Sequence, residues 1–381
     1  MRAVYTIADN ILSPLGFNTE ENFLNLKQEL TGIKKHDDPA VSPQPFQASL
    51  FSDKQRAALM KGADTDHSMF ERALINSVKD ALSYTSVDPA DPKTVFIISS
   101  TKGNIAMVEK PESERVSAET ISLYHSAKIV ATHFDNRNLP LVVSNACISG
   151  VLAILTAKRL IESGAYEHAI VAGADIITKF ILSGFQSFQA VSPEPCKPFD
   201  QARDGVTLGE GAATMILSVD SSKGNKSVLV MAGSTSNDAN HISGPSRTGE
   251  PLFNSISKSI KQAGIKNTDI GFISAHGTAT IYNDEMEARA ISLAGMQQVP
   301  VNSLKGYYGH TLGAAGLIES IVSVESLRED IVLPTKGFRN LGVSQEINVC
   351  AELENRNLKY MLKTASGFGG CNAAMIFGKN T

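Results

Sequence analysis

The chain of 381 residues is 42% apolar, so it can bury the core of one large α/β unit or of two or three domains. Its formal net charge of −4 argues against partners that need a basic protein, such as nucleic acids or anionic membrane surfaces.

The N-terminus and the cysteines indicate the cellular compartment. The first residues, MRAVYTIADNILSPLG, have no basic region that leads into a long apolar core, so we expect no signal peptide. No uninterrupted apolar stretch reaches the roughly 18 residues of a transmembrane helix. The four cysteines are widely spread and form no C-x-x-C pair, which is typical of free thiols and not of a disulfide framework or a zinc site. We therefore expect a cytoplasmic protein without membrane insertion.

Short apolar runs alternate with helical patterns along most of the chain. Strands are expected at residues 94–99, 139–144, 168–175, 211–220, 228–236, 269–278, 298–306, 358–366 and 372–378. Helices are expected over residues 151–164, 251–263 and 312–328. Strands that alternate with helices of this length favour layered α/β packing with buried sheets.

The two halves of the sequence resemble each other weakly. GEGAATMIL at 209–217 and GGCNAAMIF at 369–377 share four of nine positions at an offset of 160 (369 − 209). The alternative is a chance match in sequence that is rich in glycine and alanine. A duplication would bring the start of each half's equivalent helix toward a common centre. The expected halves are 1–220, with Cys147, and 221–381, with His276, Lys305 and His310.

Cys147 stands between an apolar run, expected as a buried strand, and a helix, in the segment LPLVVSNACISGVLAIL. A helix N-terminus exposes unpaired N–H groups and a partial positive charge, which both favour a thiolate nucleophile. Those N–H groups could also hold the oxyanion that forms when a thiolate attacks a thioester. The alternative is a small buried apolar residue, which is the usual role of a free cysteine. The pattern alone leaves both possibilities open.

Two of the eight histidines lie at the end of a predicted strand or shortly after one. They are His276 in ISAHGTATIYND and His310 in NSLKGYYGHTLGAAG. Loops at strand ends are where layered α/β folds usually bind ligands. Each residue could instead be a packed loop histidine. Neither belongs to an H-x-H or H-x-x-x-H pair, so no metal site is expected.

Lys305 lies five residues before His310, and Glu319 lies in the helix that follows. A lysine beside catalytic groups within a core needs a carboxylate partner, and Glu319 is the expected one. The alternative is a solvated pair at the surface.

The segment SGFGGCN at 366–372 adds a glycine-rich turn after a strand. Its backbone could donate a second N–H group to an oxyanion, from Phe368, or it could form an ordinary hairpin turn. It lacks the spacing and the following helix of a nucleotide-binding loop.

Five segments, in this order, resemble the β-ketoacyl-acyl-carrier-protein synthases, which are Cys-His-His condensing enzymes of the thiolase superfamily. They are SNACISG, KPFDQARDGVTLGEGAA, AHGTATIYNDEMEA, NSLKGYYGHTLGAAGLIES and GFGGCNAA. The resemblance covers the chain from about Val95 to the C-terminus. It implies an α/β fold of the thiolase type, a five-layer α-β-α-β-α sandwich made of two duplicated halves.

The resemblance also implies a decarboxylative Claisen condensation in fatty-acid or polyketide/polyene biosynthesis. Cys147 would take an acyl group from a carrier-protein thioester, and a malonyl-type extender on its own carrier would supply the attacking carbon. His276 and His310 would bind the thioester carbonyl of the extender. Lys305, held by Glu319, would support the two histidines.

The substrates are expected to arrive on the phosphopantetheine arm of an acyl carrier protein, so the resemblance implies no cofactor of the protein's own. Thr278, Thr280, Phe368 and Gly369 would line the path of that arm. The N–H groups of Cys147 and Phe368 would form the oxyanion hole.

Departures from the family's pattern lie around the pocket. Ser366 stands where many relatives have a phenylalanine, Cys371 replaces a usual threonine, and Ile281-Tyr282 replaces a common proline and leucine. These changes leave the catalytic positions intact. They favour a secondary-metabolite or polyene pathway over bulk fatty-acid elongation.

Two other functions fit parts of the pattern. A coenzyme A thiolase also uses a second cysteine near a C-terminal glycine motif, but Cys371 follows the glycines, and AHGT has a histidine where thiolases usually have an asparagine. A chain-length-factor-like partner of another ketosynthase would typically lose the nucleophile, which is kept here. The chain could still be the active half of such a heterodimer.

The resemblance implies an acyl carrier protein as a partner, and a homodimer or a heterodimer with a related subunit. Carrier proteins are acidic, so a basic patch would suit docking. Lys54, Arg56 and Lys61 in FSDKQRAALMKG lie where relatives hold such residues. The alternative is that this cluster is only a solvated helix face.

Overall fold

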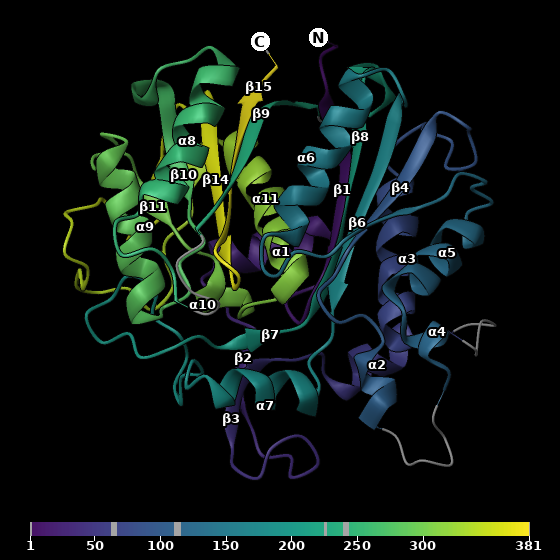
Figure 1. Ribbon diagram of the computed structural model, residues 1–381, viewed down its shortest axis with the longest axis horizontal. Coiled ribbons are helices and arrows are strands. Elements are labelled where there is room, and N and C mark those ends of the chain that lie inside the picture. The colour runs from purple at the N-terminus through teal and green to yellow at the C-terminus, as the bar shows by residue number, and fades with distance from the viewer. Residues whose placement is uncertain (1, 62–66, 110–115, 225–226, 239–243, 381) are drawn as a thin grey trace.

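The computed structural model describes residues 2–61, 67–109, 116–224, 227–238 and 244–380 (Figure 1). Its largest element is a sheet of ten strands in the order β11-β10-β14-β15-β9-β1-β8-β6-β4-β5. The sheet consists of two five-stranded halves, which meet where β1 pairs with β9.

The two halves of the sheet repeat one topology. The N-terminal half contains β1 (Tyr5–Leu12), β8 (Gly211–Ser218), β6 (His168–Asp175), β4 (Thr94–Ser99) and β5 (Leu141–Val143). The C-terminal half contains β9 (Val228–Asn237), β15 (Cys371–Lys379), β14 (Tyr360–Gly367), β10 (Ile270–Ser274) and β11 (Val301–Asn302). In each half the first strand lies beside the fifth, followed by the fourth, the second and the third. The weak repeat in the sequence therefore falls on equivalent strands, β8 and β15, while the boundary at residue 220 stays a prediction.

Helices cover both faces of each half, which gives five layers (Figure 1). The outer helices on the N-terminal half are α3 (Met69–Leu82) and α5 (Leu123–His133). On the C-terminal half α8 (Glu250–Ala263) packs against the sheet, with α9 (Ile281–Leu293) beside it. The central layer consists of α6 (Ser149–Glu162) and α11 (Leu312–Glu329). The expected α-β-α-β-α sandwich is confirmed.

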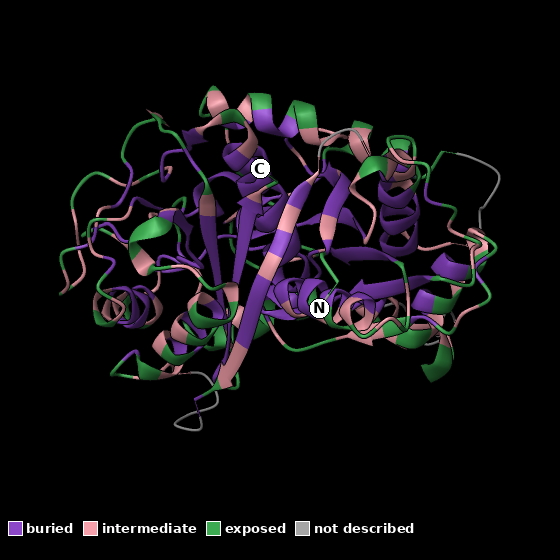
Figure 2. Cartoon of the chain, turned by 90° about the horizontal axis from the view of Figure 1, so that it is seen from above, coloured by how far each residue is buried: buried purple, intermediate pink, exposed green. Residues whose placement is uncertain are grey.

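The composition of the inner elements explains their position. Every residue of β4, β6 and β8 is buried, as expected for strands that are covered on both faces. The central helix α11 is buried from its first residue to Leu327, because small and apolar side chains surround its axis. Figure 2 shows the buried residues concentrated in the strands and the central helices, with the exposed residues toward the periphery.

The central helices cross closely at Gly150 and Gly316. A Cβ added to Gly150 would lie 2.4 Å from the nitrogen of Leu317, and one added to Gly316 would collide with α6. Only glycine lets the two backbones approach this closely. The crossing brings the starts of both helices, and with them Cys147 and His310, to a common centre.

A smaller layer covers the end of the ten-stranded sheet at which the central helices α6 and α11 begin. It contains the three-stranded sheet β2 (Ile33–His36), β3 (Phe46–Ser49) and β7 (Leu208–Gly209), with α2 (Asp53–Leu59) and α7 (Lys179–Ser187) nearby (Figure 1). The other α-helices and strands are α1 (Thr19–Lys27), α4 (Ala118–Ile121), α10 (Lys305–Tyr308), and β12 (Ile331–Val332) paired with β13 (Glu354–Asn355). Three short 3-10 helices in the described residues are η1 (Ile105–Glu109), η3 (Ser221–Lys223) and η4 (Asn267–Asp269). The sequence patterns predicted none of the elements before residue 94.

The strand that leads to Cys147 differs from its expected form. The apolar run there predicted a buried strand, but β5 has only three residues and Leu141 is 37% exposed. The reason is its place at the end of the strand order, where it pairs with β4 alone in the described part of the chain. No helix among the described residues is both long and apolar enough to cross a bilayer.

Candidate active site

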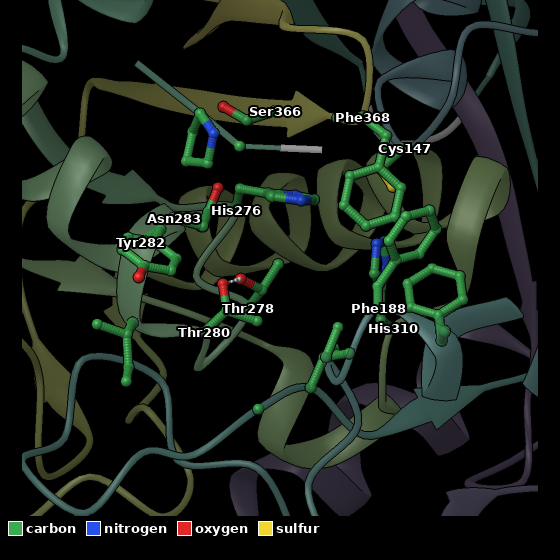
Figure 3. A pocket seen from close by; sticks show the side chains of 18 of the residues that line it. Cys147, Phe188, His276, Thr278, Thr280, Tyr282, Asn283, His310, Ser366 and Phe368 are labelled. Atoms are coloured by element: carbon green, nitrogen blue, oxygen red, sulfur yellow. Dashed lines mark hydrogen bonds between the residues drawn. The ribbon is translucent and has the colours of Figure 1, made fainter. Parts of the chain in front are cut away.

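A tight turn presents Cys147 between β5 and α6. Ala146 adopts a left-handed backbone with φ of 44°, which is uncommon outside glycine. The Ser149 hydroxyl accepts a hydrogen bond from the N–H of Asn145 at 2.8 Å and donates one to the carbonyl of Ala146 at 2.7 Å. These bonds fix the turn, so that Cys147 faces a pocket from the start of the helix (Figure 3).

His276 follows β10 and is held through its backbone. Its N–H and that of Gly277 donate to the two oxygens of Glu287, each at 2.8 Å. Its carbonyl accepts a hydrogen bond from Lys305 Nζ at 2.6 Å. Glu287 is fixed in turn by the hydroxyl of Thr364, which donates to it at 2.6 Å. Buried contacts from α9, α10 and β14 therefore place this imidazole.

His310 lies in the turn before α11. Its N–H donates to the carbonyl of Thr207 at 2.7 Å, and its carbonyl accepts from the N–H of Gly209 at 3.0 Å. The rings of His276 and His310 meet edge to face, with centroids 5.3 Å apart. The Cys147 sulfur and one ring nitrogen of each histidine all lie within 4.8 Å of one another. The fold thus brings Cys147 together with two histidines that lie more than a hundred positions further along the sequence.

A buried network of charges lies behind the histidines. Lys305 Nζ donates to Oε1 of Glu319 at 2.6 Å, which is the pairing expected from the sequence, and lies 3.3 Å from Nδ1 of His276. Lys363, on β14, lies 2.7 Å from Oε2 of Glu319 and donates to two carbonyls at the end of β10, each at 3.2 Å. All three charged side chains are buried, so each depends on the others for charge compensation.

The network keeps both imidazoles neutral. Burial lowers the pKa of His276 and of His310 well below its ordinary value, and Lys305 and Lys363 lower it further. Burial opposes the ionisation of Glu319, but the two lysines outweigh it and hold its pKa below the ordinary value. The ammonium group of Lys305 has no lone pair, so Nδ1 of His276 must accept and Nε2 carries the proton. His276 is therefore a neutral hydrogen-bond donor.

The Cys147 thiol is protonated in the resting protein. Burial raises its pKa to about 12, although Lys305 and the N–H of Phe368, which donates to the thiol, lower it. The N–H groups of the helix N-terminus were expected to favour the thiolate, and burial outweighs them in the resting protein. The proton must leave as the sulfur attacks a substrate.

Cys371 packs behind the nucleophile turn. Its sulfur lies 3.8 Å from the carbonyl of Asn145 and 3.5 Å from that of Phe368. Burial raises the pKa of this thiol to about 11. Cys371 is a packed, neutral thiol at the back of the turn.

A pocket of about 450 Å³ leads to the three residues (Figure 3). Thr278 and Thr280 line it, with their hydroxyl oxygens 2.8 Å apart. Phe368 lines it beside Cys147. Gly369, which the resemblance also placed on the path of a substrate arm, is not among the lining residues, and a Cβ added there would meet nothing within 4 Å. It serves the β14–β15 turn, where its φ is 86°.

Aromatic rings cover the pocket beside Cys147. The Phe368 ring lies 5.7 Å from that of Phe185 on α7 and 5.4 Å from that of Phe188, which directly follows α7. Phe185 also meets the ring of His310 at 6.4 Å. The sequence patterns assigned no role to these two phenylalanines; their spacing of three residues in GFQSF was the available signal.

The sequence patterns also assigned no role to three buried charged residues near the site. They are Lys363, Glu287 and Asp284, each of which accepts or donates hydrogen bonds that position the site. Asp284 accepts from the N–H of Phe199 at 2.7 Å and from that of Thr278 at 3.0 Å. Burial raises its pKa to about 7. The available sequence signal for Lys363 was a lysine inside the apolar strand YMLKTAS. Asp284 and Glu287 lie inside the motif AHGTATIYNDEMEA.

The residues expected to bind a carrier protein are not equivalent. Arg56 pairs with the buried carboxylate of Glu210 and donates to the carbonyl of Phe51 at 3.1 Å. It is a structural cation, because Glu210 would otherwise be a buried charge without compensation. Lys54 and Lys61 are exposed, and neither lines the pocket. Arg56 therefore has a structural partner that Lys54 and Lys61 lack among the described residues, and the docking role of the three residues stays a prediction.

The fold and the site together define a condensing enzyme of the Cys-His-His type. A five-layer sandwich places a nucleophile and two neutral histidines together in one pocket. Sequence profiles described as the N-terminal and the C-terminal domain of β-ketoacyl synthase match residues 1–223 and 226–339. The chain belongs to the β-ketoacyl synthase family, and it is an acyltransferase that joins acyl units by condensation.

Individual proteins agree with this family. The 3-oxoacyl-[acyl-carrier-protein] synthase 2 of Vibrio cholerae is 29% identical over 99% of both chains. That of Rhizobium meliloti is 34% identical over 63% of this chain and 60% of its own. Among solved structures, the ishigamide ketosynthase/chain length factor has a TM-score of 0.89 at 23% identity and covers 100% of both chains. The match to both β-ketoacyl synthase domains disfavours the coenzyme A thiolase.

Proposed function

We propose that this protein joins an acyl group held on Cys147 to a malonyl-type extender, with loss of carbon dioxide, and so forms a 3-oxoacyl carrier protein. The observation that carries the proposal is the convergence of Cys147, His276 and His310 within 4.8 Å at the base of an open pocket. The thiol can hold one acyl group covalently, which divides a difficult condensation into two easier transfers. The neutral imidazoles can stabilise negative charge on the second substrate.

In the first transfer the Cys147 sulfur attacks the thioester carbonyl of an acyl carrier. The thiol proton leaves as the C–S bond forms, and the carrier thiol departs with a proton when the tetrahedral intermediate collapses. The N–H groups of Cys147 and Phe368 are the proposed oxyanion hole. The Phe368 N–H supports this role, because it already donates to the sulfur in the resting protein.

In the second transfer His276 and His310 bind the thioester carbonyl of the extender. When the bond to the carboxylate breaks, its electron pair forms an enolate, which these side chains stabilise. The enolate carbon attacks the acyl carbonyl on Cys147, and the C–S bond then breaks to return the thiolate, which takes up a proton. Lys305, fixed by Glu319, keeps His276 in its donor tautomer.

Both substrates are proposed to arrive on the phosphopantetheine arm of an acyl carrier protein. A pocket of about 450 Å³ suits a narrow arm, and the hydroxyls of Thr278 and Thr280 face that space. Solved ketosynthases include one in complex with its chain length factor, from Xenorhabdus doucetiae, and one in complex with an acyl-carrier protein. We accordingly propose a dimer, formed with a second copy or with a related subunit.

We also propose a secondary-metabolite or polyene pathway, as the departures from the family's pattern favour. Ser366, Ile281 and Tyr282 all line the pocket, so these departures alter the surface that a substrate meets. Activity restricted to ordinary saturated long-chain acyl carriers would contradict this assignment.

Intact-protein mass spectrometry tests the proposed reaction. The protein is incubated with a panel of acyl carrier-protein thioesters, beside a Cys147→Ala control. We expect an adduct of the acyl mass on the wild type, its absence from the control, and its conversion to a 3-oxoacyl carrier when a malonyl carrier is added. A folded protein that accepts no donor would instead favour a chain-length-factor-like partner of another ketosynthase.

A further inference from the structure

Large apolar side chains are exposed at the mouth of the pocket. Tyr282 is 76% exposed, Ile281 58% and Phe188 55%, and all three line the pocket. Tyr282 and Phe188 lie on opposite sides of it (Figure 3). We call these three residues the apolar rim. Exposed apolar groups gathered around a cavity mark an interaction surface, and tyrosine is among the residues enriched there.

The charge of the pocket lining does not suit an acidic partner. Among the lining residues that the structure describes, Asp204 and Asp238 carry carboxylates, and there is no lysine or arginine. Asp204 is exposed. The basic residues Lys54 and Lys61 lie at α2, outside the lining. The described lining of the pocket therefore offers apolar contact and no positive charge.

The backbone beneath the rim is fixed although its side chains are free. The guanidinium of Arg203 donates to the carbonyl of Gly342 at 2.6 Å and to that of Ile281 at 3.5 Å. Asp284, in the first turn of α9, accepts the N–H of Phe199 at 2.7 Å. A rigid turn that presents an exposed ring loses little conformational freedom on binding, so Tyr282 is preorganised as an anchor.

We propose that the acyl carrier protein docks on the apolar rim through apolar contacts, with Tyr282 as the main anchor. The inference rests on the proposed function, because an arm that carries a thioester down to Cys147 must leave the body of its carrier on the pocket mouth. The partner is therefore a carrier domain with an apolar face around the attachment point of its arm. Its acidic surface contributes little to docking here.

The test compares two donors that differ only in the carrier. The acyl group that gives the strongest adduct is presented once on an acidic acyl carrier protein and once on free pantetheine, and the rate of Cys147 acylation is followed by intact mass. Tyr282→Ala is compared with Tyr84→Ala, because Tyr84 is 49% exposed but lines a different pocket. Circular dichroism checks that both variants are folded.

We expect Tyr282→Ala to slow acylation from the carrier-bound donor about tenfold more than acylation from pantetheine. Tyr84→Ala should slow neither reaction. The wild-type rate with the carrier should change less than about threefold between about 0.05 and about 0.5 M NaCl, because apolar contacts are not screened by salt.

Three results would overturn the inference in distinguishable ways. Equal rates for Tyr282→Ala and the wild type with the carrier would show that Tyr282 is not an anchor. A loss confined to a Lys54→Glu/Lys61→Glu variant, with a steep salt dependence, would assign docking to the basic surface at α2. If neither donor acylates the wild type, the proposed function itself fails, whereas a failure of the docking inference alone leaves the wild type acylated by both.

Discussion

Lys363 Nζ lies 2.7 Å from Oε2 of Glu319, while Lys305 Nζ lies 2.6 Å from Oε1 of the same carboxylate. Glu319 therefore pairs directly with two buried ammonium groups, and the buried carboxylate of Glu287 also favours the charge on Lys363. Burial is the main cause that lowers the pKa of His276 and of His310, and the nearby charges of Lys305 and Lys363 lower it further, so both imidazoles are held in the neutral form. Lys363 thus belongs to the electrostatic support of the site, although it lies outside the pocket lining.

Removal of the Lys363 charge should destabilise the protein. We expect Lys363→Met to lower the free energy of unfolding by about 3 kcal/mol, the low end of the range for a broken buried ion pair, because Lys305 still compensates Glu319. Urea denaturation measures the change. Lys258→Met, at an exposed position on α8, is the matched control and should leave the midpoint nearly unchanged. Equal midpoints for both variants would show that Glu319 does not need its second partner.

The pH dependence of stability should change when Asp284 is replaced by asparagine. Burial is the main cause that raises the pKa of Asp284 from 3.8 to about 7, so the folded state favours the protonated carboxyl. The stability that this preference contributes is fully present below pH 3.8 and is lost as the pH rises through about 7. Asparagine does not titrate.

The unfolding free energy of the wild type should therefore fall relative to that of Asp284→Asn as the pH rises from about 4 to about 7, by at most about 1.4 kcal/mol per pH unit. Chemical denaturation of both proteins across this range measures the difference. Parallel curves would show that Asp284 is ionised in the folded protein throughout.

The chemistry of the site could be predicted because its residues occur in ordered, recognisable segments. Cys147, His276 and His310 each lie at a strand end or before a helix, which is where both the motifs and the α/β pattern place functional groups. The partnership of Lys305 with Glu319 followed from the need of a buried lysine for a carboxylate. The long buried strands also followed from their continuous apolar runs.

Other features depend on contacts that no local pattern contains. Arg56 pairs with Glu210, which lies 154 positions away, so the sequence near Arg56 did not reveal this structural role. The burial that protonates Cys147 comes from the closure of the two halves around the central helices, which no single segment contains. Exposure of β5 depends on its place in the strand order. Each of these features depends on tertiary contacts between segments that are distant in the sequence.

The aromatic cover over Cys147 should protect its acyl group from water. We expect Phe188→Ala to speed the hydrolysis of preformed acyl-Cys147 by about 2- to 10-fold, which corresponds to the loss of a ring pair worth about 0.5–1.5 kcal/mol. The acyl group is loaded from pantetheine, so carrier docking does not affect the result, and its decay is followed by intact mass.

Phe180→Ala is the matched control for this change. Phe180 lies on α7, which Phe188 directly follows, and is 52% exposed, close to the 55% of Phe188, but its ring does not meet that of Phe368. Its replacement should leave the decay rate unaltered. Faster decay in both variants would point to a general loosening of α7 and not to the ring contact.

A side chain at Gly150 on α6 should destabilise the crossing of the two central helices. An added Cβ would lie 2.4 Å from the backbone nitrogen of Leu317, so Gly150→Ala must push α6 and α11 apart. We expect a loss of about 1–3 kcal/mol in unfolding free energy, as for other overpacked cores, together with slower acylation of Cys147 because the nucleophile turn moves with α6. Gly184→Ala is the control: Gly184 is also helical, but its added Cβ would meet nothing within 4 Å, so alanine should stabilise α7 by up to about 1 kcal/mol. Thermal and urea unfolding of the two variants should therefore shift in opposite directions. A Gly150→Ala variant as stable as the wild type or more stable would mean that the helices can separate at little cost.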